Sequence, residues 1–181
     1  MIQNKIFIDR LKNKTIYKDC FEVHNLDSYA YIDAESFFKY AWSIYIKYQN
    51  KYYAINNKKV NNSTNGQAFE IIFGFVLDHE NILIDSMDSE VPSIPLVRPD
   101  FIVKKNINFF ISLKTTIRER WKQADWESLK YKKKFPDAEC YLLVNNKQDC
   151  ESLKKKISIL DIDRVYYAGS KDINTLIAKI K

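Results

Sequence analysis

The chain is poor in glycine, proline and cysteine, with three, four and three residues of these types among 181. It has no glycine-rich phosphate loop, which argues against an ATP-dependent enzyme. The cysteines, Cys20, Cys140 and Cys150, are odd in number and form no CxxC pair, so neither a disulfide framework nor a zinc site is indicated. We expect them to be buried thiols in a reducing cytosol. His24 and His79 are isolated, so the sequence does not support histidine-based nuclease chemistry.

Long apolar runs are also missing. The run from Ile71 to Leu77 is far shorter than the roughly 18 residues needed to cross a bilayer. The N-terminus also lacks the basic segment and long apolar stretch of a signal peptide, so we expect a soluble, cytoplasmic protein. With 46% hydrophobic and 14% aromatic residues, the chain is long enough for a single domain, residues 1–181. We expect its first part, residues 1–65, to be helical.

Arginine is scarce as well. Lysine accounts for 24 of the 29 basic residues, and the five arginines stand at positions 10, 98, 118, 120 and 164. The bias towards Lys, Asn and Ile is typical of an AT-rich genome, so arginine placement is more informative than lysine number. A net charge of +6 and a pI near 9.0 suit a polyanionic partner. Two of the arginines lie in one short stretch, "ISLKTTIRERWKQ" (111–123).

The first half of the chain predicts two helices followed by three strands. An aromatic amphipathic helix is expected in residues 33–55, with Asp33 near its N-cap. Loops are expected at 55–66 and 88–99, a second helix at 66–77, and strands at 81–86, 98–103 and 109–116. The turn between the last two strands is rich in asparagine, so these strands should form an antiparallel hairpin.

The second half alternates helices and strands. A helix is expected from about 118 to 134, with Trp121, Ala124, Ser128, Tyr131 and Phe135 on one stripe. After it we expect a buried strand at 140–144, a helix at 151–160, a strand at 164–169 and a helix at 172–180. This order predicts an α/β protein with a mixed central sheet flanked by helices.

A carboxylate and an ammonium group should meet at one end of the hairpin. Because side chains alternate along a strand, Ser112 and Lys114 share one face, and Phe109, Ile111 and Leu113 share the other. Asp100, which follows Pro99 at the start of the paired strand, can then reach Lys114.

A second carboxylate lies on the following helix. There Arg120, Gln123, Glu127 and Lys130 fall on one polar stripe. If this helix packs back against the hairpin, Glu127 can reach Asp100 and Lys114. Two carboxylates with a lysine are the minimum for metal-assisted phosphodiester cleavage. The same residues are also compatible with a chance Pro-Asp pair and a solvated glutamate.

The segment "KTTIRERWKQ" resembles the type II restriction endonucleases of the EcoRII, PspGI, SsoII and NgoMIV group, within the PD-(D/E)XK nuclease superfamily. In that group the second acid of the motif has moved from the strand to the next helix, which leaves a small residue two positions before the lysine. Ser112 occupies the vacated position, and Glu127 follows Lys114 at a similar spacing. "GQAFE" is similar to the upstream helical segment of the group, with Glu70 as its glutamate.

The resemblance spans 66–127, about a third of the chain, and implies a restriction-endonuclease-like core in residues 66–181. It implies a catalytic set of Glu70, Asp100, Lys114 and Glu127. Asp100 and Glu127 would bind Mg²⁺, Lys114 would act on the attacking water, and Glu70 would support the metal site.

The resemblance also implies a base-reading role for Arg118, Glu119 and Arg120, because the group reads adjacent G·C pairs with such a triplet. Guanidinium groups match O6 and N7 of guanine, and a carboxylate accepts from N4 of cytosine. A target with CC/GG half-sites is therefore expected. Lys122 and Gln123 complete the expected DNA-binding set, with Lys122 contacting phosphate.

The leading hypothesis is a Mg²⁺-dependent, sequence-specific endonuclease that cuts double-stranded DNA as a homodimer at a palindromic site. The chain is short, so it could instead be a cleavage subunit that borrows recognition from a partner. A repair or junction-resolving nuclease of the same superfamily is a second alternative, although it should lack the base-reading triplet. A third is a basic DNA-binding module in which the acids and lysine form only a structural ion cluster.

Overall fold

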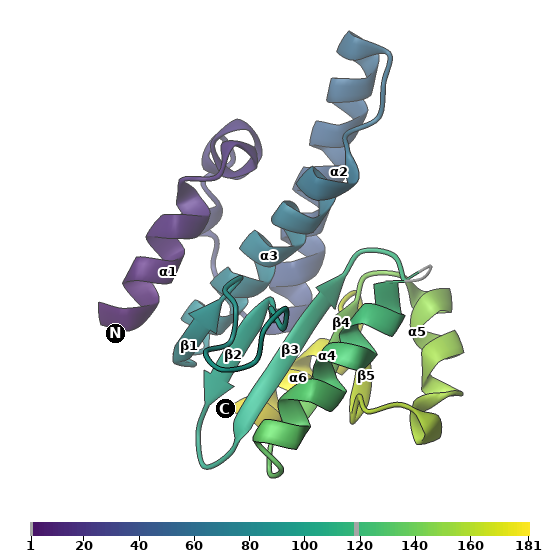
Figure 1. Ribbon diagram of the computed structural model, residues 1–181. Coiled ribbons are helices and arrows are strands. Elements are labelled where there is room, and N and C mark those ends of the chain that lie inside the picture. The colour runs from purple at the N-terminus through teal and green to yellow at the C-terminus, as the bar shows by residue number, and fades with distance from the viewer. Residues whose placement is uncertain (1, 118–119) are drawn as a thin grey trace.

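The computed structural model describes residues 2–117 and 120–181 as an α/β fold around one five-stranded sheet (Figure 1). The strands are β1 (Ile84–Met87), β2 (Phe101–Lys104), β3 (Asn108–Lys114), β4 (Glu139–Val144) and β5 (Arg164–Tyr167). The α-helices are α1 (Ile2–Lys12), α2 (Ala34–Asn56), α3 (Asn62–His79), α4 (Arg120–Lys134), α5 (Lys147–Lys154) and α6 (Asp172–Ile180). Each expected strand is confirmed within a few residues of its expected bounds.

The sheet has the spatial order β1-β2-β3-β4-β5 and is mixed. β1, β2 and β3 are antiparallel neighbours, whereas β3, β4 and β5 run parallel. The β2–β3 hairpin pairs Phe101 with Ile111, as expected from its asparagine-rich turn. Helices α4 and α5 are the crossovers that parallel neighbours require.

Helices cover both faces of the sheet. Phe109, Ile111 and Leu113 of β3 share one hydrophobic cluster with residues of α2, α3 and α6. On the opposite face, Phe110 packs against Tyr131 of α4, with ring centroids 4.9 Å apart. The expected fold class, a mixed sheet flanked by helices, is therefore confirmed.

Helix α1 is attached to the start of the sheet by buried and partly buried polar contacts. Asn4 of α1 donates to the carbonyl of Ile82 at 2.8 Å and accepts from the N–H of Ile84 at 3.0 Å. Arg10 donates to the carbonyl of Met87 at 3.0 Å. A π-helix, Tyr17–Glu22, and a 3₁₀ turn, Leu26–Ser28, lead from α1 to α2.

Helix α2 begins where expected, because the Asp33 carboxylate caps the N–H of Ser36 at 2.7 Å. The loop expected at 55–66 is wrong in its extent: α2 continues to Asn56 and α3 begins at Asn62. Asn61 supplies the missing start signal, since its side chain accepts from the N–H of Thr64 at 2.8 Å. The end of α2 and the start of α3 project beyond the rest of the molecule (Figure 1).

The helix expected at 151–160 is also wrong in its bounds. α5 spans Lys147–Lys154, and a 3₁₀ turn, Ile157–Ile159, follows it. The early start has a local cause, because the Asn146 side chain accepts from the N–H of Asp149 at 2.9 Å. Within the described ranges, no helix is long and apolar enough to span a bilayer.

Candidate active site

Asp100 and Lys114 meet at the end of the β2–β3 hairpin. Oδ2 of Asp100 accepts from the backbone N–H of Leu113 at 2.6 Å and from Nζ of Lys114 at 3.3 Å. Their side chains are 20% and 13% exposed, so water screens this pair less than it screens a surface ion pair. The predicted contact between the strand-end lysine and the acid is present.

The loop before Asp100, residues 88–99, packs against side chains of β3 and α4. Val91, Ile94 and Val97 are buried in the cluster that contains Phe110 and Tyr131. Its last residues connect directly to β2, and the N–H of Asp88 donates to the carbonyl of Asp100 at 3.1 Å. The Asp100 backbone is therefore held from both the hairpin and the preceding loop.

Glu127 of α4 interacts electrostatically with this pair. It is only 2% exposed, and Gln123 donates to its Oε1 at 2.9 Å. Burial raises the pKa of Glu127, and the negative charge of Asp100 raises it further. Lys114 and the backbone N–H of Arg98 lower it. Glu127 is thus close enough to interact electrostatically with both residues of the hairpin pair, and it is not a solvated helix glutamate.

Ser112 lies on the same strand face as Lys114, beneath α4. It is 2% exposed, and within the described part of the chain its Oγ has no hydrogen-bond partner. A longer side chain at this position would need the space between β3 and α4. The small residue therefore leaves room for the acid that comes from the helix.

Glu70 lies on α3, and its carboxylate forms an ion pair with Lys14, which follows α1. Burial raises the pKa of Glu70, and the negative charges of Asp100 and Asp88 contribute in the same direction. Lys14 lowers it. Sequence reasoning missed Lys14, because no local pattern marks a contact between residues 56 positions apart.

The metal-binding set of Asp100, Glu127 and Glu70 stays a prediction. In residues 2–117 and 120–181, no group of three or more His, Cys, Asp or Glu side chains is arranged to hold a metal ion. Two carboxylates nevertheless suit Mg²⁺, which is usually bound by one or two carboxylates, several waters and substrate phosphates. The carboxylate oxygens of Asp100 and Glu127 are donors of this kind, and within the described residues the buried hydroxyl of Ser112, on the same strand as Lys114, lacks a hydrogen-bond partner.

The expected DNA-binding residues are only partly described. Arg118 and Glu119 lie outside the described residues. Arg120 is exposed as the first residue of α4, and its N–H donates to the carbonyl of Ile117 at 2.6 Å. Lys122 and Gln123 are exposed in the same first turn of α4. The Gln123 amide donates to Glu127, so the first turn of α4 lies beside that carboxylate.

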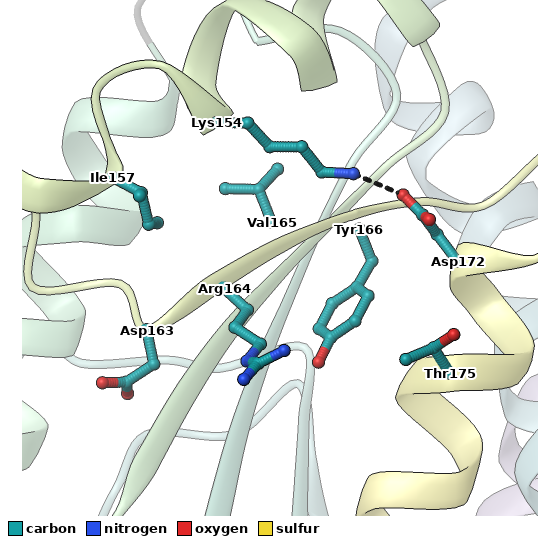
Figure 2. A pocket seen from close by; sticks show the side chains of 8 residues that line it. All are labelled: Lys154, Ile157, Asp163, Arg164, Val165, Tyr166, Asp172 and Thr175. Atoms are coloured by element: carbon teal, nitrogen blue, oxygen red, sulfur yellow. Dashed lines mark hydrogen bonds and ion pairs between the residues drawn. The ribbon is translucent and has the colours of Figure 1, made fainter.

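A pocket of about 410 Å³ lies elsewhere, between α5, β5 and α6 (Figure 2). Lys154 crosses it to pair with Asp172 at 2.6 Å. The Asp172 carboxylate also accepts from the N–H of Tyr167 at 3.3 Å. Lys154 and Asp172 thus pair with each other, and none of the four predicted catalytic residues lines the pocket. This pocket is therefore separate from the predicted catalytic residues.

Comparison with known proteins bears on the fold. No protein-family model matches the chain, and no curated protein matches its sequence. A solved complex of the restriction endonuclease PspGI with substrate DNA is similar in structure, with a TM-score of 0.57 and 19% sequence identity. The match covers 98% of this chain and 82% of the PspGI chain. The fold is thus restriction-endonuclease-like.

Proposed function

We propose that this protein is a Mg²⁺-dependent, sequence-specific endonuclease that cleaves double-stranded DNA. The observation that carries the proposal is the Asp100–Lys114 pair, 3.3 Å apart, together with the buried Glu127 on which both residues act electrostatically. The restriction-endonuclease-like fold supports the proposal, with Asp100 just before β2, Lys114 at the end of β3 and Glu127 on α4.

Each residue has a defined part in this proposal. Asp100 and Glu127 would hold Mg²⁺, which when bound would supply positive charge to a phosphodiester. Lys114, positioned by Asp100, orients the attacking water and balances the charge that develops on the phosphate oxygens. Glu70, on α3, supports the metal site or its bound water.

Sequence recognition is proposed for the start of α4. Arg118, Glu119 and Arg120 read adjacent G·C pairs, and Lys122 contacts phosphate. Gln123, in the first turn of α4, donates to Glu127 at 2.9 Å. In this proposal, base reading at the start of α4 therefore takes place next to the phosphodiester that is cut. We further propose a homodimer, in which each copy cuts one strand of a palindrome.

The test is incubation of the protein with plasmid DNA and Mg²⁺, followed by sequencing of the fragment ends. The proposal expects ends that map to one short palindrome with adjacent G·C pairs. Cleavage without a common sequence would leave a nuclease but contradict the recognition role of the triplet. If DNA is bound but not cut with Mg²⁺ or Mn²⁺, the non-catalytic alternative is favoured.

A further inference from the structure

Lys14 contacts Glu70, one of the predicted catalytic residues, although Lys14 lies outside the segment 66–127 that carries the sequence motifs. It lies between α1 and the π-helix, and its Nζ pairs with Oε2 of Glu70. The two side chains are 17% and 16% exposed. By comparison, the ion pair between Lys12 and Asp27 in the same part of the chain is 35% and 42% exposed. The contact of Lys14 is therefore a partly desolvated pair.

The surroundings of Glu70 contain several negative charges. Asp100 and Asp88 both act electrostatically on Glu70, and Lys14 opposes them. Asp88 also has a cation nearby, since Arg10 lies 3.6 Å from its carboxylate. Without Lys14, the Glu70 charge would add to that of Asp100, in a region that has to accept a DNA phosphate.

We propose that Lys14 is an electrostatic component of the active site, whose ammonium group balances Glu70 so that an anionic phosphodiester can approach Asp100. This inference rests on the proposed nuclease function and extends it with a charged residue from the N-terminal segment. Lys14 acts through Glu70 and is therefore a positioning residue.

The role has a signature that a packing role lacks. Removing a positive charge beside the carboxylates strengthens their attraction for a divalent cation and leaves their repulsion of a phosphate less compensated. The two affinities therefore change in opposite directions. A loosened site would bind both the cation and DNA more weakly.

The experiment compares Lys14→Met with Lys14→Arg, which keeps the charge, and with Lys12→Met as the matched control. Calorimetric titration measures the Mn²⁺ affinity of each full-length protein without DNA. Fluorescence anisotropy in Ca²⁺ measures the affinity for a mixed-sequence DNA duplex. For Lys14→Met, tighter Mn²⁺ binding and weaker DNA binding, each by at least about threefold, are expected. Lys14→Arg and Lys12→Met should match the wild type in both.

Two results overturn the role of Lys14: unchanged affinities in Lys14→Met, or a loss of both affinities in a variant that still melts cooperatively. If Lys14→Met does not fold, Lys14→Gln replaces it, because its amide can still donate to Glu70 without carrying charge. Plasmid cleavage by the wild type tests the nuclease function separately. Absence of cleavage contradicts the nuclease function. The directions in which the affinities for Mn²⁺ and for DNA change in Lys14→Met test the electrostatic role of Lys14.

Discussion

Asp100 and Lys114 lie 14 positions apart in the chain, and their charged groups are 3.3 Å apart in space. A comparable pair, Asp85 of β1 and Lys104 of β2, lies in the same sheet at 3.0 Å. That second pair is more exposed, at 32% and 57%, than the first, at 20% and 13%. Burial and the nearby Glu127 therefore distinguish the candidate site from an ordinary surface ion pair.

The effect of replacing Asp100 on the free energy of unfolding should depend on whether the new side chain can accept a hydrogen bond from Leu113. Asp100→Ala leaves the N–H of Leu113, now bonded at 2.6 Å, without its partner, which costs about 1–3 kcal/mol. Asp100→Asn retains an acceptor and should cost less. Urea unfolding measures both variants, and equal losses would show that the hydrogen bond to Leu113 contributes little.

Ser112→Ala should leave the free energy of unfolding unchanged or raise it by up to about 1 kcal/mol. The reason is that the buried Oγ of Ser112 has no hydrogen-bond partner within the described part of the protein, so its removal relieves a desolvation cost. Denaturant unfolding without divalent ions is the measurement. A loss of more than about 1 kcal/mol would mean that the hydroxyl is satisfied, for example by ordered water.

Arg120→Ala should reduce discrimination between the mapped target and a scrambled duplex by about 1–3 kcal/mol, if its guanidinium group reads guanine. Lys133→Ala is the control on the same helix. Lys133 is also exposed but lies about 20 Å further along α4 at 1.5 Å per residue. Binding titrations in Ca²⁺ give the two affinities. Equal losses of Arg120→Ala on both duplexes would reduce its role to general electrostatic attraction.

The contact between Glu80 and Lys181 should make stability depend on pH. Burial alone would raise the pKa of Glu80, but hydrogen bonds from Lys181 and Tyr31, at 2.9 and 2.6 Å, outweigh burial and lower it. A lowered carboxylate pKa stabilises the fold above the unfolded value of about 4.3. This contribution is lost as the pH falls through the folded-state pKa.

Glu80→Gln tests this contact. It should lower the free energy of unfolding by about 1 kcal/mol at neutral pH, a modest value because Lys181 is half exposed. The difference from the wild type should shrink as the medium becomes acidic, since both proteins are then uncharged at this position. A difference that stays constant with pH would assign the effect to packing.

The central hairpin was predictable because its signals are local. Alternation places Ser112 and Lys114 on one strand face, and the asparagine-rich turn pairs that strand with the one that follows Asp100. The position of Glu127 was predictable only on the condition that α4 packs against β3. That condition is met, since Tyr131 of the same helix contacts Phe110.

Other parts were not predictable for physical reasons. The Lys14–Glu70 contact depends on how α1 docks, and a contact across 56 positions leaves no periodic signal. The start of α3 was missed because Asn61, a capping residue, stands in a polar stretch that also fits a loop. The bounds of α5 likewise depend on the side-chain cap at Asn146.

The most direct test is single-turnover cleavage of plasmid DNA in Mg²⁺ by the wild type, Asp100→Asn, Lys114→Met and Glu127→Gln. Lys104→Met serves as the control, because it removes a lysine of the same hairpin whose ion pair, with Asp85 of β1, is more exposed. We expect the three site variants to lose cleavage by at least about a hundredfold, the scale of a lost acid, base or charge-stabilising group, and Lys104→Met to keep it. Wild-type rates in the Asp100→Asn and Lys114→Met variants would contradict an active site at the end of the β2–β3 hairpin.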